Sequence, residues 1–306
     1  MVQRLNVAII GLGDIAHKAY LPFIMGRADI KVSCLMNRSF ATLSTVGERF
    51  RVNCLYTNVD DVIGHGVDCA FVHTATESHA EIVMKLLSHG VDVYVDKPLA
   101  YTLEEAERMV DTAEKCNRIL MVGFNRRFAP QYAAAKEQIG DQSTLIIAEK
   151  HRNGLQRQDY RITMLDDMIH MIDLLRWFGG AALHTLPHVN VTSQGWLQDA
   201  SAMVRFAGNG VGFAAMNREA GGDREWLEVH GNGLTITVED MSQMRIVSHG
   251  REEVRTVGKW DSLTYNRGFE GAVNHFIQCV QTRVKPLTSG EEALATQRLV
   301  ETIVKS

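Results

Sequence analysis

The stretch Leu5-Asn6-Val7-Ala8-Ile9-Ile10-Gly11-Leu12-Gly13-Asp14-Ile15-Ala16 decides how the N-terminal part of this chain folds. Leu5 to Ile10 is an apolar run typical of a buried strand, and it ends at a glycine-rich turn that opens a helical pattern. Gly11 permits a tight turn, Gly13 lets the backbone approach a pyrophosphate, and Ala16 allows close packing of the helix on the strand. The stretch therefore predicts a dinucleotide-binding turn.

Phosphates would bind at the N-terminus of the helix that follows the turn, where backbone N–H groups and a partial positive charge are available. The residues expected to bind the cofactor at this turn are Gly11, Gly13, Asp14, Ile15 and Ala16.

A second determinant of the cofactor follows the apolar run Ile30 to Met36. An acid usually stands here and binds the ribose hydroxyls of the adenosine. This chain has Asn37 and Arg38 instead, and Arg38 could pair with a 2′-phosphate that an acid would repel. We expect NADP or NAD as cofactor, with NADP preferred; the alternative is that Arg38 is a solvated loop arginine.

The rest of the first 125 residues alternates short strand-like runs with helical patterns, which is typical of a parallel sheet covered on both faces. We expect Pro22 to shorten or kink the first helix. The further strands are expected at Asp68–His73, Asp92–Asp96 and Ile119–Phe124, and the helices at Ala41–Phe50, Ser78–Ser88 and Thr102–Asn117.

The pattern changes after about residue 140, where several strand-like runs follow one another and indicate a largely antiparallel sheet. The sequence thus predicts an α/β protein with a Rossmann doubly wound parallel sheet in residues 1–124 and a substrate-binding α/β domain in residues 125–306. In the second part we expect a strand at Thr144–Lys150, a helix at Met164–Phe178, hairpin turns in Phe206–Val211 and Gly231–Gly233, and closing helices at Gly268–Thr282 and Gly290–Val304.

Composition excludes several classes of function. The 306 residues carry a formal net charge of −4 and no long basic run, so a nucleic-acid partner is not expected. No apolar stretch is long enough to span a bilayer, and the N-terminus lacks the apolar run of a secretory signal. The five cysteines are widely spaced without a CxxC, and we expect reduced core residues, no metal site and a cytoplasmic protein.

Two segments carry candidate catalytic groups. Lys97 lies after an expected parallel strand, at the edge where open α/β sheets bind ligands. Asp166, His170 and Asp173 have helical i, i+4, i+7 spacing within a heavily apolar segment, so this polar stripe needs partners or faces a cavity. Each segment also has a structural interpretation: a surface lysine in one, and a capping aspartate with a core histidine in the other. Arg126 could orient an anionic ligand, or with Arg127 it could tie the two domains together.

Taken in order, these residues resemble the Gfo/Idh/MocA oxidoreductases, the family of glucose–fructose oxidoreductase and inositol dehydrogenase. The segment Thr74-Ala75-Thr76 is similar to the MviM-like branch but departs from the family's Thr-Pro-Asn, and Met168 replaces a glycine. The four stretches that carry the resemblance are Ile10–Ala16, Asp96–Leu99, Val122–Phe128 and Asp166–Asp173.

The resemblance implies an NAD(P)-dependent oxidoreductase that moves a hydride between nicotinamide and a hydroxyl-bearing carbon of a sugar, cyclitol or related polyol. It implies that Lys97, Asp166 and His170 are catalytic, with His170 as acid–base, and we expect Arg126 and Asp173 to bind substrate. We further expect a homodimer through the C-terminal sheet. The alternative function is a non-catalytic nucleotide- or sugar-binding regulatory protein. The remaining residues expected in the cofactor site are Thr74, Ala75, Thr76, His79, Asp96 and Lys97.

Overall fold

The computed structural model describes residues 4–208 and 210–305 and divides them into two units. The first unit contains the described residues up to Gly123 together with Phe269–Leu294, and the second contains Phe124–Gly268 and the residues from Ala295 onward. The sequence analysis placed the boundary after residue 124, whereas the break between the two units lies after Gly123. Residues 269–294, which we assigned to the second domain, lie in the first unit.

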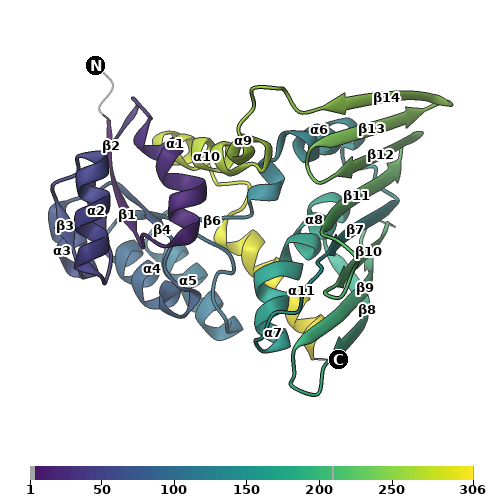
Figure 1. The fold of residues 1–306 in the computed structure, drawn as a ribbon, viewed down its shortest axis with the longest axis horizontal. Coiled ribbons are helices and arrows are strands. Elements are labelled where there is room, and N and C mark those ends of the chain that lie inside the picture. The colour runs from purple at the N-terminus through teal and green to yellow at the C-terminus, as the bar shows by residue number, and fades with distance from the viewer. Residues whose placement is uncertain (1–3, 209, 306) are drawn as a thin grey trace. The chain divides into compact units, whose positions relative to one another are not determined.

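The first unit is built on a parallel sheet of six strands within the described part of the chain, in the order β3-β2-β1-β4-β5-β6 (Figure 1). The predicted doubly wound sheet is confirmed. Its strands are β1 (Leu5–Ile10), β2 (Ile30–Met36), β3 (Leu55–Tyr56), β4 (Cys69–Val72), β5 (Asp92–Val95) and β6 (Leu120–Val122). Its helices are η1 (Ala16–Tyr20), α1 (Leu21–Met25), α2 (Phe40–Phe50), α3 (Val59–His65), η2 (Thr76–Ser78), α4 (His79–Ser88), α5 (Leu103–Lys115) and α10 (Phe269–Thr282).

The first helix shows how the chain accommodates Pro22. Residues Ala16–Tyr20 form a π-helical segment, and Leu21–Met25 continue it as α-helix with Pro22 in the first turn. A proline lacks the N–H that would bind a carbonyl in the preceding turn. The wider turn just before Pro22 lets the helix continue past it, and the α-helical part then ends at Met25.

The outer edge of β6 explains why residues 269–294 join the first unit. The Val122 N–H donates to the Thr288 carbonyl at 2.8 Å, and the Thr288 hydroxyl donates to the Val122 carbonyl at 2.8 Å. Met121 also forms an antiparallel bridge with Ser289. The segment before α11 (Gly290–Val304) therefore satisfies the backbone groups of this edge strand.

The second unit carries a sheet of eight strands among its described residues, in the order β14-β13-β12-β11-β7-β10-β9-β8. β7 and β10 pair in parallel, whereas the other neighbours are antiparallel, which confirms the predicted, largely antiparallel sheet. The strands are β7 (Leu145–His151), β8 (Ala182–Val191), β9 (Leu197–Phe206), β10 (Val211–Asn217), β11 (Arg224–Gly231), β12 (Leu234–Glu239), β13 (Gln243–Ser248) and β14 (Arg251–Thr256).

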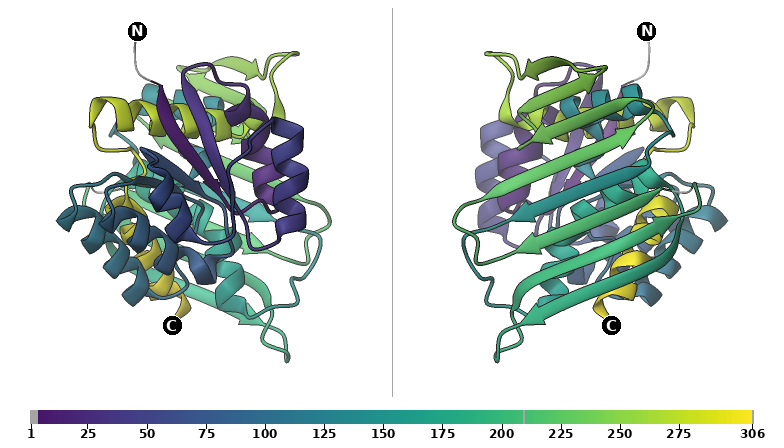
Figure 2. Two further views of the ribbon diagram at one scale, coloured as in Figure 1. Left: turned by 90° about the vertical axis from the view of Figure 1, so that its left-hand side faces the viewer. Right: turned by 90° about the vertical axis from the view of Figure 1, so that its right-hand side faces the viewer.

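Helices cover one face of this sheet. α8 packs on β7 and β10. The right-hand panel of Figure 2 shows the other face with no helix across it. Both predicted hairpins form, β9–β10 and β11–β12, although Asn209 of the first turn lies outside the described residues. The helices are η3 (Asn125–Phe128), α6 (Pro130–Ile139), α7 (Tyr160–Thr163), η4 (Met164–Met168), α8 (Ile169–Gly179), α9 (Leu263–Asn266) and the part of α11 from Ala295 onward.

No helix in residues 4–208 and 210–305 is long and apolar enough to cross a membrane. In the same residues, no group of three or more His, Cys, Asp or Glu side chains is arranged to hold a metal ion. All five cysteines are free thiols, and Cys34, Cys69 and Cys279 are buried.

Candidate active site

A pocket of about 510 Å³ lies at the carboxyl ends of β1, β2 and β4 in the first unit. Open parallel sheets bind their ligands at this edge. The pocket is lined by the Gly11–Gly13 turn, Met36–Arg38, Thr57–Asp60, His73–Ala75 and side chains of the α4 region. Six residues predicted to bind the cofactor thus line one cavity: Gly11, Gly13, Asn37, Arg38, Thr74 and Ala75.

The glycine turn fits a dinucleotide. Gly11 has φ +87°, and a Cβ placed on it would lie 2.6 Å from the backbone of His73 and Thr74, so only glycine suits this turn. A Cβ on Gly13 would meet no protein atom within 4 Å, which leaves the backbone open to a ligand. Gly11 is therefore required by the tight turn, and the backbone of Gly13 is accessible.

The second-strand end is held directly to this turn. Asn37 Oδ1 accepts a hydrogen bond from the Leu12 N–H at 3.2 Å, and Arg38 is exposed beside it. Across the pocket, Lys85 Nζ pairs with Asp60 at 2.7 Å. The sequence analysis did not predict eight further residues that line this pocket, because they follow the two-residue strand β3 or lie in the α4 region and form no recognisable motif. These residues are Thr57, Asn58, Val59, Asp60, Ser78, Glu81, Ile82 and Lys85.

Other predicted cofactor residues lie near this edge without lining the pocket. Asp14 pairs with Lys18 at 2.6 Å in an exposed i, i+4 contact, Ile15 is 41% exposed, and Ala16 is buried. Thr76 begins the short helix η2. Lys97 is partly exposed directly after β5, and its peptide bond to Pro98 is cis.

His79 connects two loops whose residues are expected to bind the cofactor, the one after β4 and the one after β5. Its side chain is buried, with Nδ1 3.1 Å from the Pro98 carbonyl and Nε2 3.1 Å from the Thr74 carbonyl. Burial lowers the pKa of His79, although the charge of Asp96 and the two carbonyls oppose this shift. The ring therefore fixes the loop that follows β4 against the Lys97–Pro98 segment.

Asp96 lies within a buried hydrogen-bond network. Its Oδ1 accepts from the Tyr20 hydroxyl at 2.7 Å, and its Oδ2 lies 2.8 Å from His73 Nδ1. Tyr20 also bonds Tyr94 at 2.9 Å and stacks on His73. Burial would raise the pKa of Asp96, but the neighbouring His73 and the hydrogen bonds outweigh it and hold that pKa below its usual value. Asp96, the residue before Lys97, is therefore charged and held in place by hydrogen bonds.

In the second unit, Asp166 and His170 lie on consecutive helical segments. Asp166 is partly exposed in η4, and His170 is buried in α8, where its ring meets Phe124 edge-on. η4 is π-helical, with the Ile169 N–H bonded to the Met164 carbonyl five residues back. Such one-turn π segments occur frequently at functional sites.

Asp173, the third residue of the helical stripe, is bound inside the second unit. Arg127 reaches it with Nη2 at 2.7 Å and Nε at 2.9 Å, and the Thr296 hydroxyl donates to it at 2.9 Å. Both side chains of the ion pair are almost fully buried.

Arg126 forms a second pair of the same kind. Its Nε and Nη2 bind the two oxygens of Glu225 at 2.7 and 2.8 Å. Burial would raise the pKa of Glu225, but Arg126 outweighs it and holds that pKa at about 2. Both arginines of the Asn125-Arg126-Arg127-Phe128 segment therefore bind carboxylates of the second unit.

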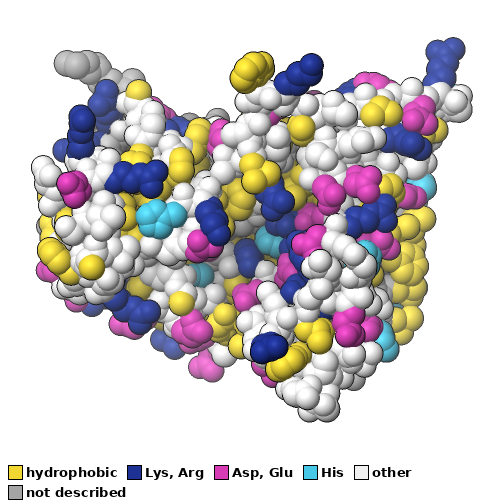
Figure 3. Space-filling view, in the orientation of Figure 1, with side chains coloured by type: hydrophobic (Ala, Val, Ile, Leu, Met, Phe, Trp, Pro, Cys, Tyr) yellow, Lys and Arg dark blue, Asp and Glu magenta, His cyan; other side chains and the backbone are white. Residues whose placement is uncertain are grey.

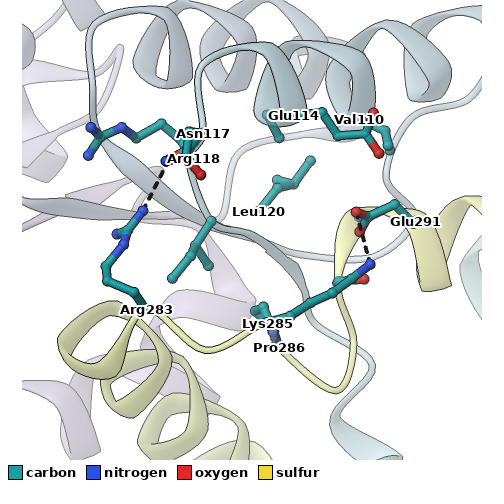
Figure 4. A pocket seen from close by; sticks show the side chains of 13 residues that line it. Val110, Glu114, Asn117, Arg118, Leu120, Arg283, Lys285, Pro286 and Glu291 are labelled. Carbon is teal, nitrogen blue, oxygen red and sulfur yellow. Dashed lines mark hydrogen bonds and ion pairs between the residues drawn. The ribbon is translucent and has the colours of Figure 1, made fainter.

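A further pocket of about 380 Å³ lies at the amino end of β6 in the first unit, at the opposite edge of the sheet from the first pocket. Two of its cations, Arg283 and Lys285, have protein partners, and Figure 4 marks contacts of both with dashed lines. Arg283 pairs with Asp92 and donates to the Asn117 carbonyl at 3.1 Å, and Lys285 pairs with Glu291 at 3.1 Å. In the space-filling view, side chains of both charges are interleaved without a large area of one sign (Figure 3).

Comparison with known proteins identifies the family to which the chain belongs. Residues 5–124 match the Gfo/Idh/MocA model, described as an oxidoreductase family with an NAD-binding Rossmann fold, and residues 130–249 match the YceM-like C-terminal domain. YceM of Salmonella typhimurium is 33% identical over 303 residues, which cover 99% of this chain and 98% of that protein. The chain belongs to the Gfo/Idh/MocA family of oxidoreductases.

Two further relatives place the chain within this Gfo/Idh/MocA family. The crystal structure of a dehydrogenase, MviM, from Clostridium difficile has 31% identity and a TM-score of 0.93 over 99% of both chains. An inositol 2-dehydrogenase/D-chiro-inositol 3-dehydrogenase from Shouchella clausii is 27% identical over 285 residues, covering 84% of this chain and 79% of that enzyme. The predicted MviM-like branch is confirmed, and the chain is an NAD(P)-dependent dehydrogenase with a cofactor-binding Rossmann domain.

Proposed function

We propose that this dehydrogenase transfers a hydride between the nicotinamide of NADP or NAD and a hydroxyl-bearing carbon of a sugar, cyclitol or related polyol. The observation that carries the proposal is the position of the His79 ring, whose two nitrogens each lie 3.1 Å from a carbonyl oxygen, that of Thr74 and that of Pro98. Thr74 lines the pocket of the glycine turn, and Pro98 follows Lys97. One buried side chain thus holds the expected catalytic lysine in a fixed relation to the cofactor pocket.

The protein's own part in such a reaction is orientation and proton transfer, while a bound nicotinamide would supply the hydride chemistry. Lys97 follows β5 at the edge of the sheet where the cofactor pocket lies. Its ammonium would donate to the reacting oxygen and lower the pKa of that hydroxyl. His170 would take the proton that the alcohol loses on oxidation, with Asp166 orienting His170 or the hydroxyl.

The family relatives support the substrate class. The Shouchella clausii relative named above is an inositol dehydrogenase, and inositol is a cyclitol. The buried Arg126–Glu225 and Arg127–Asp173 pairs support a framework role for these side chains, and we propose that Arg126 and Asp173 act on substrate by shaping the second unit rather than by direct contact.

NADP is proposed as the preferred cofactor. Asn37 uses its carbonyl oxygen to hold the glycine turn, and Arg38 lines the same pocket beside it. A cation without an adjacent acid at this position suits a 2′-phosphate. We propose in addition that the enzyme works in the cytoplasm, where its five free thiols would stay reduced.

A second copy of the chain is the proposed partner of the outer sheet face. Leu186, Met203 and Phe213 lie opposite one another on β8, β9 and β10, and Leu186 and Phe213 are 55% and 42% exposed. Hydrophobic side chains gather along the right-hand edge of Figure 3, over these strands. Apolar patches of this kind commonly mark protein interfaces. Sedimentation analysis would show a dimer that Phe213→Lys converts to a monomer.

The test of the proposed activity is spectroscopic. Purified protein with NADP⁺ or NAD⁺ should produce absorbance at the reduced-nicotinamide band when a substrate polyol from a panel of sugars, sugar acids, sugar phosphates and cyclitols is added. Nucleotide binding without turnover of any compound would favour the regulatory alternative.

A further inference from the structure

Asp167 lies among three cations in the second unit. Lys150 pairs with one of its carboxylate oxygens and Arg218 with the other. Arg152 Nε lies 3.9 Å from the oxygen that Arg218 binds. Asp167 directly follows Asp166 in η4, so this cluster, defined as Lys150, Arg152, Asp167 and Arg218, adjoins the expected catalytic turn.

The parallel pairing of two strands gathers these cations. Lys150 is the penultimate residue of β7, Arg152 follows β7, and Arg218 follows β10. The carboxyl ends of parallel strands lie at the same edge of a sheet. The Arg152 N–H donates to the Asn217 carbonyl at 2.8 Å, which keeps the two strand ends together. An antiparallel pairing of β7 and β10 would have put these residues at opposite edges.

The cluster has more positive than negative charge. The side chains of Lys150 and Arg218 are 4% and 7% exposed, and that of Arg152 is 25% exposed. All three cations share one carboxylate, that of Asp167. Of the nearby acids, Asp223 lies 3.7 Å from Arg152 and is largely exposed. Buried cations without matching anions are costly.

Lys150 reflects this imbalance. Burial and the neighbouring Arg126 lower the pKa of Lys150 to about 7, and Asp167 opposes them only in part. Glu225, the other buried carboxylate near Lys150, already holds Arg126 through two hydrogen bonds. A further anion at this edge would stabilise the charged lysine.

Arginine geometry suits such an anion. Arg218 uses Nε for the Gly154 carbonyl at 3.1 Å and Nη1 for Asp167, and its third nitrogen carries two further N–H donors. Arg152 is the most exposed cation of the cluster. Planar guanidinium groups bind carboxylate and phosphate oxygens in pairs of hydrogen bonds.

We propose that Arg152 and Arg218, supported by Lys150, bind an anionic group of the substrate, so that the substrate is a polyol bearing a carboxylate or a phosphate rather than a neutral sugar or cyclitol. The proposal rests on the proposed function, because it takes Asp166 and His170 to act on a hydroxyl of the same molecule. The anion site would select the substrate by its charge, which neither Lys97 nor His170 does.

The first test measures anion binding without turnover. Thermal unfolding of the full-length protein with its nucleotide is followed while inorganic phosphate or malonate is titrated at constant ionic strength. We expect saturable stabilisation that Arg152→Gln weakens by at least tenfold in apparent affinity, that Arg218→Lys retains in part, and that the exposed control Arg108→Gln leaves unchanged. Phosphate and malonate distinguish the two anion types. Absence of saturable binding, or equal binding by Arg152→Gln and the control, overturns the proposal.

The second test compares matched substrates: glucose with glucuronate and glucose 6-phosphate, and myo-inositol with its monophosphate. One charge-assisted contact is worth roughly 1.5–3 kcal/mol, so an anionic member should have about ten- to a hundredfold higher kcat/KM. Arg152→Gln should remove this preference by raising KM for the anionic members of each pair. Faster oxidation of the neutral members would contradict the anion site but uphold the dehydrogenase. Cofactor binding without any turnover would contradict the proposed function, and the first test alone would then decide the anion site.

Discussion

Asn37 Oδ1 accepts a hydrogen bond from the Leu12 N–H at 3.2 Å, so the side chain that replaces the usual ribose-binding acid holds the glycine turn in place. An aspartate could accept the same bond, because its carboxylate oxygen occupies the same position. Asn37→Asp therefore changes the charge beside Arg38 and keeps the bond to Leu12, but it loses the long bond from Asn37 Nδ2 to the Ser39 carbonyl, 3.4 Å.

Asn37→Asp should reverse the cofactor preference. The new carboxylate would repel a 2′-phosphate and accept hydrogen bonds from ribose hydroxyls, so NADP affinity should fall by about ten- to a hundredfold while NAD affinity is kept or improved. Fluorescence titration of both reduced cofactors measures the effect. Arg38→Ala should weaken NADP binding alone. Equal NADP and NAD affinities in the unchanged protein would show that Arg38 is a solvated arginine.

Gly13→Val should abolish nucleotide binding without unfolding the first unit. A Cβ on Gly13 meets no protein atom within 4 Å, so the branched side chain would occupy only the space that the pyrophosphate needs. Gly64→Val is the matched control, since its Cβ also meets nothing within 4 Å and it does not line the pocket. Calorimetric titration and melting temperature separate binding from stability. A variant that still binds nucleotide would place the cofactor elsewhere.

Gly11→Ala should instead lower the stability of the protein. Its Cβ would lie 2.6 Å from the His73 and Thr74 backbone at a φ of +87°, so the ends of β1 and β4 would have to move apart. We expect a loss of at least about 1–3 kcal/mol in the free energy of unfolding, measured by urea denaturation. Unchanged stability would mean that the turn tolerates a side chain and that packing does not require glycine there.

The sequence was sufficient to predict the features that depend on local pattern. The glycine turn, the alternation of strands and helices and the two hairpins all follow from residue type and spacing. The two π-helical segments, Ala16–Tyr20 and Met164–Met168, could not be predicted, because their residues do not differ in type from those of ordinary helices. The second of these changes the register that we assumed when we placed Asp166 and His170 on one helical face.

Partners that are distant in the sequence account for the rest. Arg126 and Arg127 were visible as a pair of cations, but Glu225 and Asp173 lie 99 and 46 residues away, and no local pattern links them. The cations around Asp167 meet only because β7 and β10 pair in parallel. The return of residues 269–294 to the first unit likewise depends on the edge of β6, which a sequence pattern does not reveal.

Loss of the Arg126–Glu225 pair should destabilise the second unit in a pH-dependent way. Arg126 holds the pKa of Glu225 at about 2, below its ordinary value of 4.5. A carboxylate with a depressed folded-state pKa stabilises the protein above its unfolded-state pKa, and this contribution is lost as the pH falls from about 4.5 to about 2. Glu225→Gln should cost about 3–5 kcal/mol at pH 7, because it leaves Arg126 buried without its carboxylate.

The matched control for this pair is exposed. Glu253 pairs with Arg255 on β14 at 2.5 Å, but both side chains are accessible to solvent. Glu253→Gln should therefore change the free energy of unfolding by less than about 1 kcal/mol. Urea denaturation between pH 3 and pH 7 compares the variants. If Glu225→Gln and Glu253→Gln have equal effects, the buried pair does not stabilise the second unit.

Catalysis should depend on Lys97 and on His170. Lys97→Ala and His170→Ala should each lower turnover by about 10²–10⁴-fold, because one would remove the donor to the reacting oxygen and the other would remove the base. Nucleotide affinity should remain within a few-fold of the unchanged protein in both variants, and the exposed Lys115→Ala serves as the control for a lost lysine.

Since His170 is buried, His170→Gln separates loss of the base from loss of packing. If its role is acid–base chemistry, His170→Gln should be as inactive as the alanine variant. Normal turnover by His170→Gln at the unchanged melting temperature would assign His170 to the core and leave Lys97 without its proposed partner.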